Sequence, residues 1–283
     1  MFRSWMFIPG SQDKHLEKAE SLSADALIFD LEDAVSEKDK ETARCKVKSC
    51  LSHLTEKTNF VRVNALTTPH FLEDVRKVVC SELAGIVLPK VNQKEDIGIA
   101  DYLLGQFEMR YHLPKAFTKI VPIIESASGL YRAHEIATAS ERISCLAFGA
   151  EDYKLDVTID SQGSELELLY ARSKLVTASK AAGKDAPIDS VYTDFGDEKG
   201  LEESAKMGKK LGFQGKLLIH PKQINTVNSV YSPTEEQIKE AKRILEVYET
   251  SFNHEDGAIQ IDGKMVDRPV VEQARKLLSL VEV

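Results

Sequence analysis

Two acidic residues, Glu125 and Asp152, stand at the ends of short apolar segments. The segments read KIVPIIE and CLAFGAED, and each has the length of a buried strand. An unpaired carboxylate has no packing role in such a strand, because burying an uncompensated charge is unfavourable. If both strands belong to one parallel sheet, the two carboxylates meet at its carboxyl edge, where ligands and metal ions bind in such folds. The pair therefore predicts a site that uses two acids together.

Further polar residues occupy the ends of other predicted strands. The full set comprises Glu32, Asp33, Arg62, Asn64, Lys90, Glu125, Asp152 and His220. Several acids that face one opening repel each other unless a cation lies among them. Oxygen ligands suit Mg²⁺, whereas zinc would require more His or Cys than this set offers. We therefore predict that Glu125 and Asp152 bind Mg²⁺, and that Glu32 and Asp33 contact its waters, the substrate or neighbouring side chains.

Each acid of the pair also has a simpler interpretation. Glu125 could cap a helix that begins in the following SASGL segment, and Asp152 could cap its own loop. Neither role explains why both acids occur at consecutive strand ends. The adjacent Glu151 would point away on an extended chain and is predicted to form a salt bridge.

The basic residues at the strand ends leave alternatives open. Arg62, between the valines of FVRVN, suits a substrate carboxylate or enolate oxygen, and equally an ion pair with Glu32 or Asp33. Lys90 could form a Schiff base, although an electrostatic role agrees better with a metal site. His220 is predicted to be a hydrogen-bonded residue of the rim. The chain has no GxSxG motif, and no Cys–His pair suggests an acyl-enzyme.

The elements that must position these residues alternate along the chain. Apolar, β-rich segments predict strands at 4–9, 25–32, 59–64, 85–91, 119–125, 145–152, 187–193 and 215–221. Helical spacing of apolar residues predicts helices at 14–22, 38–54, 71–83, 94–108, 129–139, 164–183 (capped by Ser164) and 198–211. Nearly continuous apolar strands indicate a sheet that is buried on both faces. The pattern predicts an α/β fold, a (β/α)8 TIM barrel over residues 1–225.

Residues 226–283 are predicted to form a C-terminal extension of the barrel. A helix is expected over 234–252, followed by a hairpin in AIQIDGKMVDRP with a turn at Asp262–Gly263. A last helix is expected over 270–280. The extension is too small to be an independent domain.

Composition excludes several classes of protein. A net charge of -8 argues against nucleic acid as the main partner, because phosphate binding requires a basic surface. No apolar run approaches the length of a membrane span, and the N-terminus does not resemble a signal peptide. The four cysteines form no CxxC pair. These features predict a cytoplasmic enzyme without disulfides or structural zinc.

The motifs resemble those of the citrate lyase β-subunit-like family within the HpcH/HpaI aldolase superfamily. They cover nearly the whole chain in the family's order: RSWMFIPGS, DLEDAV, VRVNAL, LPKV, PIIESASGL, FGAEDY, YARSKLVTASKAAG, GKLLIHPKQI and DGKMVDRP. The resemblance implies a Mg²⁺-dependent barrel, a homotrimer or hexamer, that acts on acyl thioesters. Glu125 and Asp152 match the family's metal ligands, and Arg62 matches its catalytic arginine. Asp267, in the extension, matches an acid that enters the active site of a neighbouring subunit.

The resemblance implies cleavage of a 3-hydroxyacyl-CoA of the citryl, citramalyl or malyl type into acetyl-CoA and a 2-oxo acid. Arg62, Glu125, Glu32 and Asp33 are then expected to contact the substrate, and Arg62 and Asp267 to be catalytic. Arg3 and Lys14 are candidates for contacts with the CoA phosphates. Three alternatives stay open: a malyl-CoA thioesterase, a subunit of a citrate lyase complex that requires an acyl carrier protein, and a class II aldolase that does not use CoA.

Overall fold

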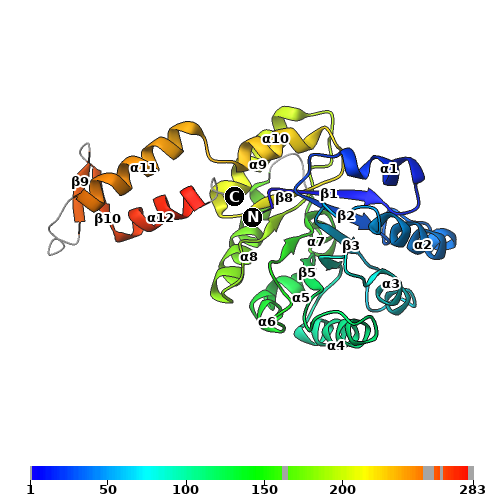
Figure 1. Ribbon diagram of the computed structural model, residues 1–283. Helices are drawn as coiled ribbons and strands as arrows, with labels where there is room; N and C mark the ends of the chain where they lie inside the picture. Colours follow the sequence, from blue (N-terminus) through cyan, green and yellow to red (C-terminus); the bar gives the residue numbers. More distant parts are fainter. Residues whose placement is uncertain (1, 161–164, 251–257, 262–263, 280–283) are drawn as a thin grey trace. The chain divides into compact units, whose positions relative to one another are not determined.

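The computed structural model describes residues 2–160, 165–250, 258–261 and 264–279, and the chain divides into two compact units, Phe2–Ser229 and Val230–Val283. The larger unit is a closed parallel barrel whose strands are paired in chain order (Figure 1). The strands are β1 (Ser4–Pro9), β2 (Ala26–Asp30), β3 (Asn59–Arg62), β4 (Gly85–Leu88), β5 (Lys119–Ile124), β6 (Ala147–Phe148), β7 (Ile188–Asp189) and β8 (Gly215–Leu218). The predicted TIM barrel is confirmed.

Helices surround the strands (Figure 1). They are α1 (Asp13–Lys18), α2 (Lys40–Leu51), α3 (Phe71–Val78), α4 (Lys94–Arg110), α5 (Ala127–Tyr131), α6 (Ala133–Thr138), α7 (Ala150–Asp156), α8 (Leu169–Ala181), α9 (Glu198–Leu211) and α10 (Gln223–Tyr231). The sequence did not predict α7 or α10. The described part of the predicted helix 164–183 begins at Leu169, after a short 3-10 turn, and its expected cap Ser164 lies outside the described residues.

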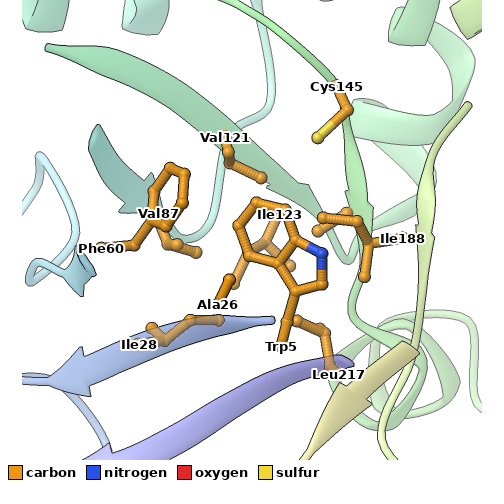
Figure 2. Packing of buried hydrophobic residues seen from close by; sticks show 11 residues of the cluster. Trp5, Ala26, Ile28, Phe60, Val87, Val121, Ile123, Cys145, Ile188 and Leu217 are labelled. Carbon is orange, nitrogen blue, oxygen red and sulfur yellow. The ribbon is translucent and has the colours of Figure 1, made fainter. Parts of the chain in front are cut away.

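The interior of the barrel is filled by apolar side chains from all eight strands or the residues next to them. Trp5 on β1 is 1% exposed, and its indole lies against the ring of Phe60 with the ring centroids 4.7 Å apart. Figure 2 shows Trp5 at the centre of a cluster that includes Ile123, Ile188 and Leu217. A buried aromatic residue removes a large apolar surface from water, so this cluster holds the strands together beneath the carboxyl ends.

The predicted strand 145–152 is much shorter than expected. Only Ala147 and Phe148 are in β6, and α7 begins at Ala150 directly after Gly149. The sequence AEDYKL consists largely of residues that tolerate a helix well, and two acids in a first turn interact favourably with the helix dipole. Asp152 therefore lies on the first turn of a helix and not at a strand end, which corrects the prediction.

The smaller unit contains α11 (Glu235–Thr250), the antiparallel pair β9 (Ala258–Ile261) and β10 (Lys264–Asp267), and α12 (Arg268–Ser279). Val266 and Val271 are buried against apolar residues of α11, including Tyr248. The predicted hairpin strands are thus present, while the predicted turn at Asp262–Gly263 lies outside the described residues. None of the helices that the structure describes is long and apolar enough to cross a membrane.

Candidate functional site

A cavity of about 430 Å³ opens at the carboxyl ends of the barrel strands. Its polar lining contains five acids and one cation: Asp30, Asp33, Glu125, Glu151, Asp152 and Arg62. Its apolar lining includes Phe7, Ile123, Phe148, Val191 and Leu217, several of which belong to the barrel core. The charged side chains therefore lie next to an apolar cavity wall, where electrostatic interactions are stronger than in water.

Glu125 follows β5 and is the most strongly perturbed acid of the cavity. It is 7% exposed, and its Oε1 accepts a hydrogen bond from the backbone N–H of Lys90 at 2.6 Å. Burial raises the pKa of Glu125 to about 8, and the nearby charges of Asp152 and Glu32 act in the same direction. Ser126, and not Glu125, caps α5 by accepting from the N–H of Gly129. The capping alternative for Glu125 is therefore wrong.

Asp152 reaches the same cavity from the first turn of α7. It lines the main cavity and also a smaller one beside it, and Glu125 lines both. The neighbouring Glu151 is 2.9 Å from Lys154 Nζ, so the predicted salt bridge of Glu151 is present. Glu125 and Asp152 thus come from adjacent strand–helix junctions and share one space.

Arg62 at the end of β3 is held by three carboxylates. Its Nε and Nη2 donate to the two oxygens of Asp30 at 2.7 and 2.6 Å, and its Nη1 lies 3.1 Å from Asp33 and 3.3 Å from Glu32. The guanidinium also lies over the Phe7 ring, 4.8 Å from the centroid. The predicted pairs with Glu32 and Asp33 are both present.

Asp30 is a residue of the site that the sequence did not reveal. It is 2% exposed, and besides Arg62 it accepts the backbone N–H groups of Glu32 and Ala34 at 2.9 and 3.0 Å. It therefore fixes both the arginine and the loop that carries Glu32. The pairing register of β2 with β3 would have revealed Asp30, because it places Asp30 directly beside Arg62.

Lys90 follows β4 and forms an ion pair with Glu32, with 2.9 Å between Nζ and Oε1. The hydrogen bond to Glu32 raises the pKa of Lys90, and burial raises the pKa of Glu32. A Schiff base requires a neutral amine, so this pair disfavours that role for Lys90. Lys90 also has a positive φ of 55°, a left-handed conformation that directs its N–H to Glu125.

A buried lysine fastens the loop after β2. Lys40 is 7% exposed, and its Nζ donates to the carbonyl oxygens of Leu31 and Glu32 and to the side-chain oxygen of Asn64, at 2.6–2.8 Å. Asn64 in turn donates to Asp74 from its backbone and its side chain. Asn64 is thus a structural residue, and Lys40 positions the loop with the acids.

A second cavity of about 350 Å³ adjoins the first and shares Phe7, Pro9 and Ile219 with it. Its basic lining residues are Lys14, His15, Lys18 and His220. The His220 ring stacks on Phe195, 5.0 Å between centroids, and its Nδ1 accepts from the Lys222 N–H, which agrees with a role at the rim. The position of Lys14 therefore suits an anionic group attached to a ligand in the first cavity.

Arg3 and Asp267 lie outside these two cavities. Arg3 precedes β1 and forms a bidentate pair with Asp25, which precedes β2, so it lies at the amino ends of the strands. This position is wrong for contact with a ligand at the carboxyl edge. Asp267 belongs to the smaller unit, where its Oδ1 accepts the Val270 N–H at the start of α12.

The acids of the cavity suit a divalent cation that prefers oxygen. Within the described residues, His, Cys, Asp and Glu side chains nowhere form a group of three or more that could hold a metal ion. Mg²⁺ usually takes only one or two carboxylates and completes its shell with water and substrate oxygens. Glu125, with its raised pKa, and the adjacent Asp152 are the pair that such an ion would stabilise.

Comparisons with known proteins agree with this geometry. The family model described as HpcH/HpaI aldolase/citrate lyase matches residues 3–221. The chain belongs to this family. A second model, described as a C–C bond lyase of the TIM-barrel fold, matches residues 166–282. Membership of the first family supports a carbon–carbon lyase.

Two relatives and one solved structure illustrate the similarity. The citrate lyase subunit beta of Leuconostoc mesenteroides subsp. cremoris is 38% identical over 98% of this chain and 92% of its own length. A (3S)-malyl-CoA thioesterase of Cereibacter sphaeroides is 34% identical over 99% of this chain and 95% of its own. The CitE protein of Mycobacterium tuberculosis, in complex with magnesium, acetoacetate and coenzyme A, is 27% identical with a TM-score of 0.81, covering 100% of this chain and 98% of that one.

The raised pKa of Glu125 predicts how the stability of the metal-free lyase depends on pH. The pKa rises from an ordinary 4.5 to about 8 on folding, so the folded state loses stability as the pH increases through this range. The loss should reach roughly 3–5 kcal/mol above pH 8. Glu125→Gln should therefore stabilise the metal-free protein at pH 9 and not at pH 5, as measured by urea unfolding with EDTA. Mg²⁺ should stabilise the wild type but not Glu125→Gln.

The matched control for this prediction is Glu151→Gln. Glu151 is exposed and adjacent to the cavity, so its amide should leave both the pH profile and the effect of Mg²⁺ unchanged. Equal pH profiles for the wild type and Glu125→Gln would contradict the burial of an unfavourable charge.

The carboxylates around Arg62 predict a strong and specific coupling. Arg62→Met leaves Asp30 buried without its cation and should lower the free energy of unfolding by about 3–5 kcal/mol. Adding Asp30→Asn should recover part of this loss, because the buried charge is then removed. Arg76→Met, which breaks the exposed pair with Glu73, should leave the urea midpoint unchanged. Simple additivity of the Arg62 and Asp30 effects would refute the coupling.

Proposed function

We propose that this lyase cleaves a 3-hydroxyacyl-CoA thioester to acetyl-CoA and a 2-oxo acid, with Mg²⁺ as cofactor. The observation that supports this proposal most is the pair Glu125 and Asp152 in a cavity that shares lining residues with a basic one. The pair suits a cation that holds a hydroxy or oxo acid. The basic cavity suits the phosphates of CoA, with Lys14 and Lys18 as their partners. The substrate would span the two cavities across Phe7.

Each residue of the site has a proposed role in this reaction. Glu125 and Asp152 would hold Mg²⁺, which when bound acidifies the substrate hydroxyl and stabilises charge on the oxo acid. Arg62 would bind a substrate carboxylate or the enolate oxygen, since it lines the cavity. A substrate oxygen could replace Asp33 as the partner of Arg62 Nη1, because the Asp33 side chain is 59% exposed. Glu32 and Asp33 would orient Arg62, Lys90 and the bound acid.

Proton transfer needs a group at the acetyl carbon. When the C–C bond breaks, a base takes the hydroxyl proton, and the enolate of the acetyl thioester takes a proton at carbon. We assign this second step to Asp267, supplied by a neighbouring subunit of a homotrimer or hexamer. In its own unit Asp267 is the last residue of β10, accepts the Val270 N–H of α12 and is partly exposed. The proposed compartment is the cytoplasm, in keeping with four cysteines that are free.

Two related activities share the same site chemistry. A thioesterase would direct water to the thioester carbonyl and release a 2-hydroxy acid, and the similarity to a (3S)-malyl-CoA thioesterase favours it. A citrate lyase subunit would use an acyl carrier protein in place of CoA, and the similarity to a citrate lyase subunit beta favours that partner. Both differ from the leading proposal in products or carrier, and so are separable by assay.

A substrate panel tests the proposed reaction. With Mg²⁺, at least one of citryl-, citramalyl- and malyl-CoA should yield a 2-oxo acid and acetyl-CoA in equal amounts, and EDTA should abolish the reaction. Chromatography of the products and a dehydrogenase-coupled assay of the oxo acid are the measurements. Free 2-hydroxy acid and CoA without oxo acid would establish the thioesterase instead. Activity only on carrier-bound substrates would establish the carrier-dependent subunit.

Mixing two inactive variants tests the role of Asp267. Asp267→Ala should bind Mg²⁺ like the wild type but lose cleavage, whereas Glu125→Gln should lose both. If an active site combines Glu125 of one subunit with Asp267 of its neighbour, equal mixing with subunit exchange should restore about a quarter of the wild-type activity. An inactive mixture, with subunit exchange verified by mass spectrometry, would rule out a shared site.

A further inference from the structure

The first turn of α7, which carries Asp152, is anchored by a residue of another strand. Gly149 precedes this turn and has no side chain that could cap it. The N–H of Ala150 instead donates to Ser190 Oγ at 2.9 Å, and Ser190 is 2% exposed. An N–H in the first turn of a helix has no acceptor within the helix, so Ser190 replaces the missing cap.

This contact lies beside a pair of strands that meet over a very short length. β6 and β7 contain two residues each, and a single residue pair, Ala147 and Ile188, aligns them. By comparison, β1 and β2 align over Trp5–Pro9 and Ala26–Asp30. The bond between Ser190 and Ala150 lies beyond the short pairing and extends the connection to the carboxyl edge.

Ser190 is itself held in a fixed orientation. Ile188 belongs to the barrel core (Figure 2), so by alternation Asp189 points outward and Ser190 inward. The carboxylate of Asp189 is fully buried and accepts from Arg172 Nε at 2.9 Å and Lys216 Nζ at 3.0 Å. These two bonds secure β7, and with it the hydroxyl of Ser190.

On its other side the same turn is pressed against Glu125. The N–H of Gly149 donates to the carbonyl oxygen of Ile124 at 3.0 Å. A Cβ at position 149 would lie 2.5 Å from Glu125 Oε2, which only glycine avoids. The first turn of α7 is therefore held by contacts with β5 on one side and with the residue after β7 on the other. Together these contacts determine where Asp152 lies relative to Glu125.

We propose that Ser190 is a positioning residue that sets the separation of Asp152 and Glu125 and thereby the affinity of the pair for a divalent cation. This inference rests on the proposed function only in placing the cation at these two carboxylates. Groups that orient metal ligands without touching the metal typically change affinity by one to two orders of magnitude. Because Ser190 lines the cavity, an added methyl group has room there.

Titration of the metal-free protein with Mg²⁺ by calorimetry, without substrate, tests this role. Ser190→Ala should raise the Kd for Mg²⁺ about tenfold, because the N–H of Ala150 loses its acceptor. Ser190→Thr keeps the oxygen and should bind like the wild type. Ser4→Ala is the matched control, since Ser4 is fully buried and its Oγ also accepts a backbone N–H, that of Asp25 at 3.0 Å, but at the amino ends of the strands. It should bind Mg²⁺ normally whatever it does to the unfolding midpoint.

A wild-type Kd for Ser190→Ala would overturn the inference, as would an equal loss of affinity in Ser4→Ala. If Ser190→Ala does not fold, Ser190→Cys serves in its place, because sulfur is a weaker acceptor and should still weaken binding. Unchanged affinity in that variant would likewise overturn the inference. Failure of the wild type to bind Mg²⁺ would instead overturn the proposed function, and the positioning role with it.

Discussion

Parallel strands that all end at one rim force their terminal acids together, and this crowding of negative charge governs the structure of the site. The acids after β2 have partners, because β3 contributes Arg62 and β4 contributes Lys90 beside them. Glu125 and Asp152 follow β5 and β6, where burial, reinforced by the nearby charge of Asp152, raises the pKa of Glu125. The rim therefore has two halves. In the compensated half, after β2 to β4, each acid is paired with a basic side chain. In the uncompensated half, Glu125 and Asp152 have no such partner within the cavity lining, and a cation can bind there.

In the compensated half, the ion pairs of Arg62 are compatible with the substrate-binding role proposed for it. Its bidentate bond to the buried Asp30 fixes the guanidinium, while its contact with the exposed Asp33 can be exchanged for a substrate oxygen. The loop itself is held from below by Lys40, a buried cation whose acceptors are neutral oxygens. Rigid positioning of a catalytic cation requires such a supporting layer, because a loose guanidinium would fold back onto the nearest acid.

The sequence predicted the barrel and most of its rim, and the failures have specific physical causes. Glu125 was recognised because a buried strand has no other use for an acid. Asp152 was assigned correctly to the cavity but to the wrong element, since the apolar run CLAFGA does not show that the sheet ends after two residues. The sequence does not show Asp30 as part of the site because its partner Arg62 lies on another strand, in register with it. It does not show Lys40 because the acceptors of Lys40 lie in the segments after β2 and β3, which only the tertiary fold brings together. The segment DLED contains three acids, and the sequence alone does not show which of them forms the bidentate pair with Arg62.

The electrostatics of the two cavities also constrain the order of binding. A CoA thioester of a hydroxy acid is anionic at both ends, and the chain as a whole carries a net charge of -8. In the proposed complex its phosphates would meet Lys14 and Lys18, and its acid end would meet the carboxylates of Glu125 and Asp152. Without a cation, the two carboxylates repel the acid end of the substrate. With a cation bound, that end could bind to the metal ion in a cavity whose lower part is apolar, where the attraction is stronger than in water. We therefore expect the cation to bind before the substrate. The two neighbouring carboxylates that are unfavourable in the metal-free protein then favour binding of the anionic substrate to the metal-bound protein.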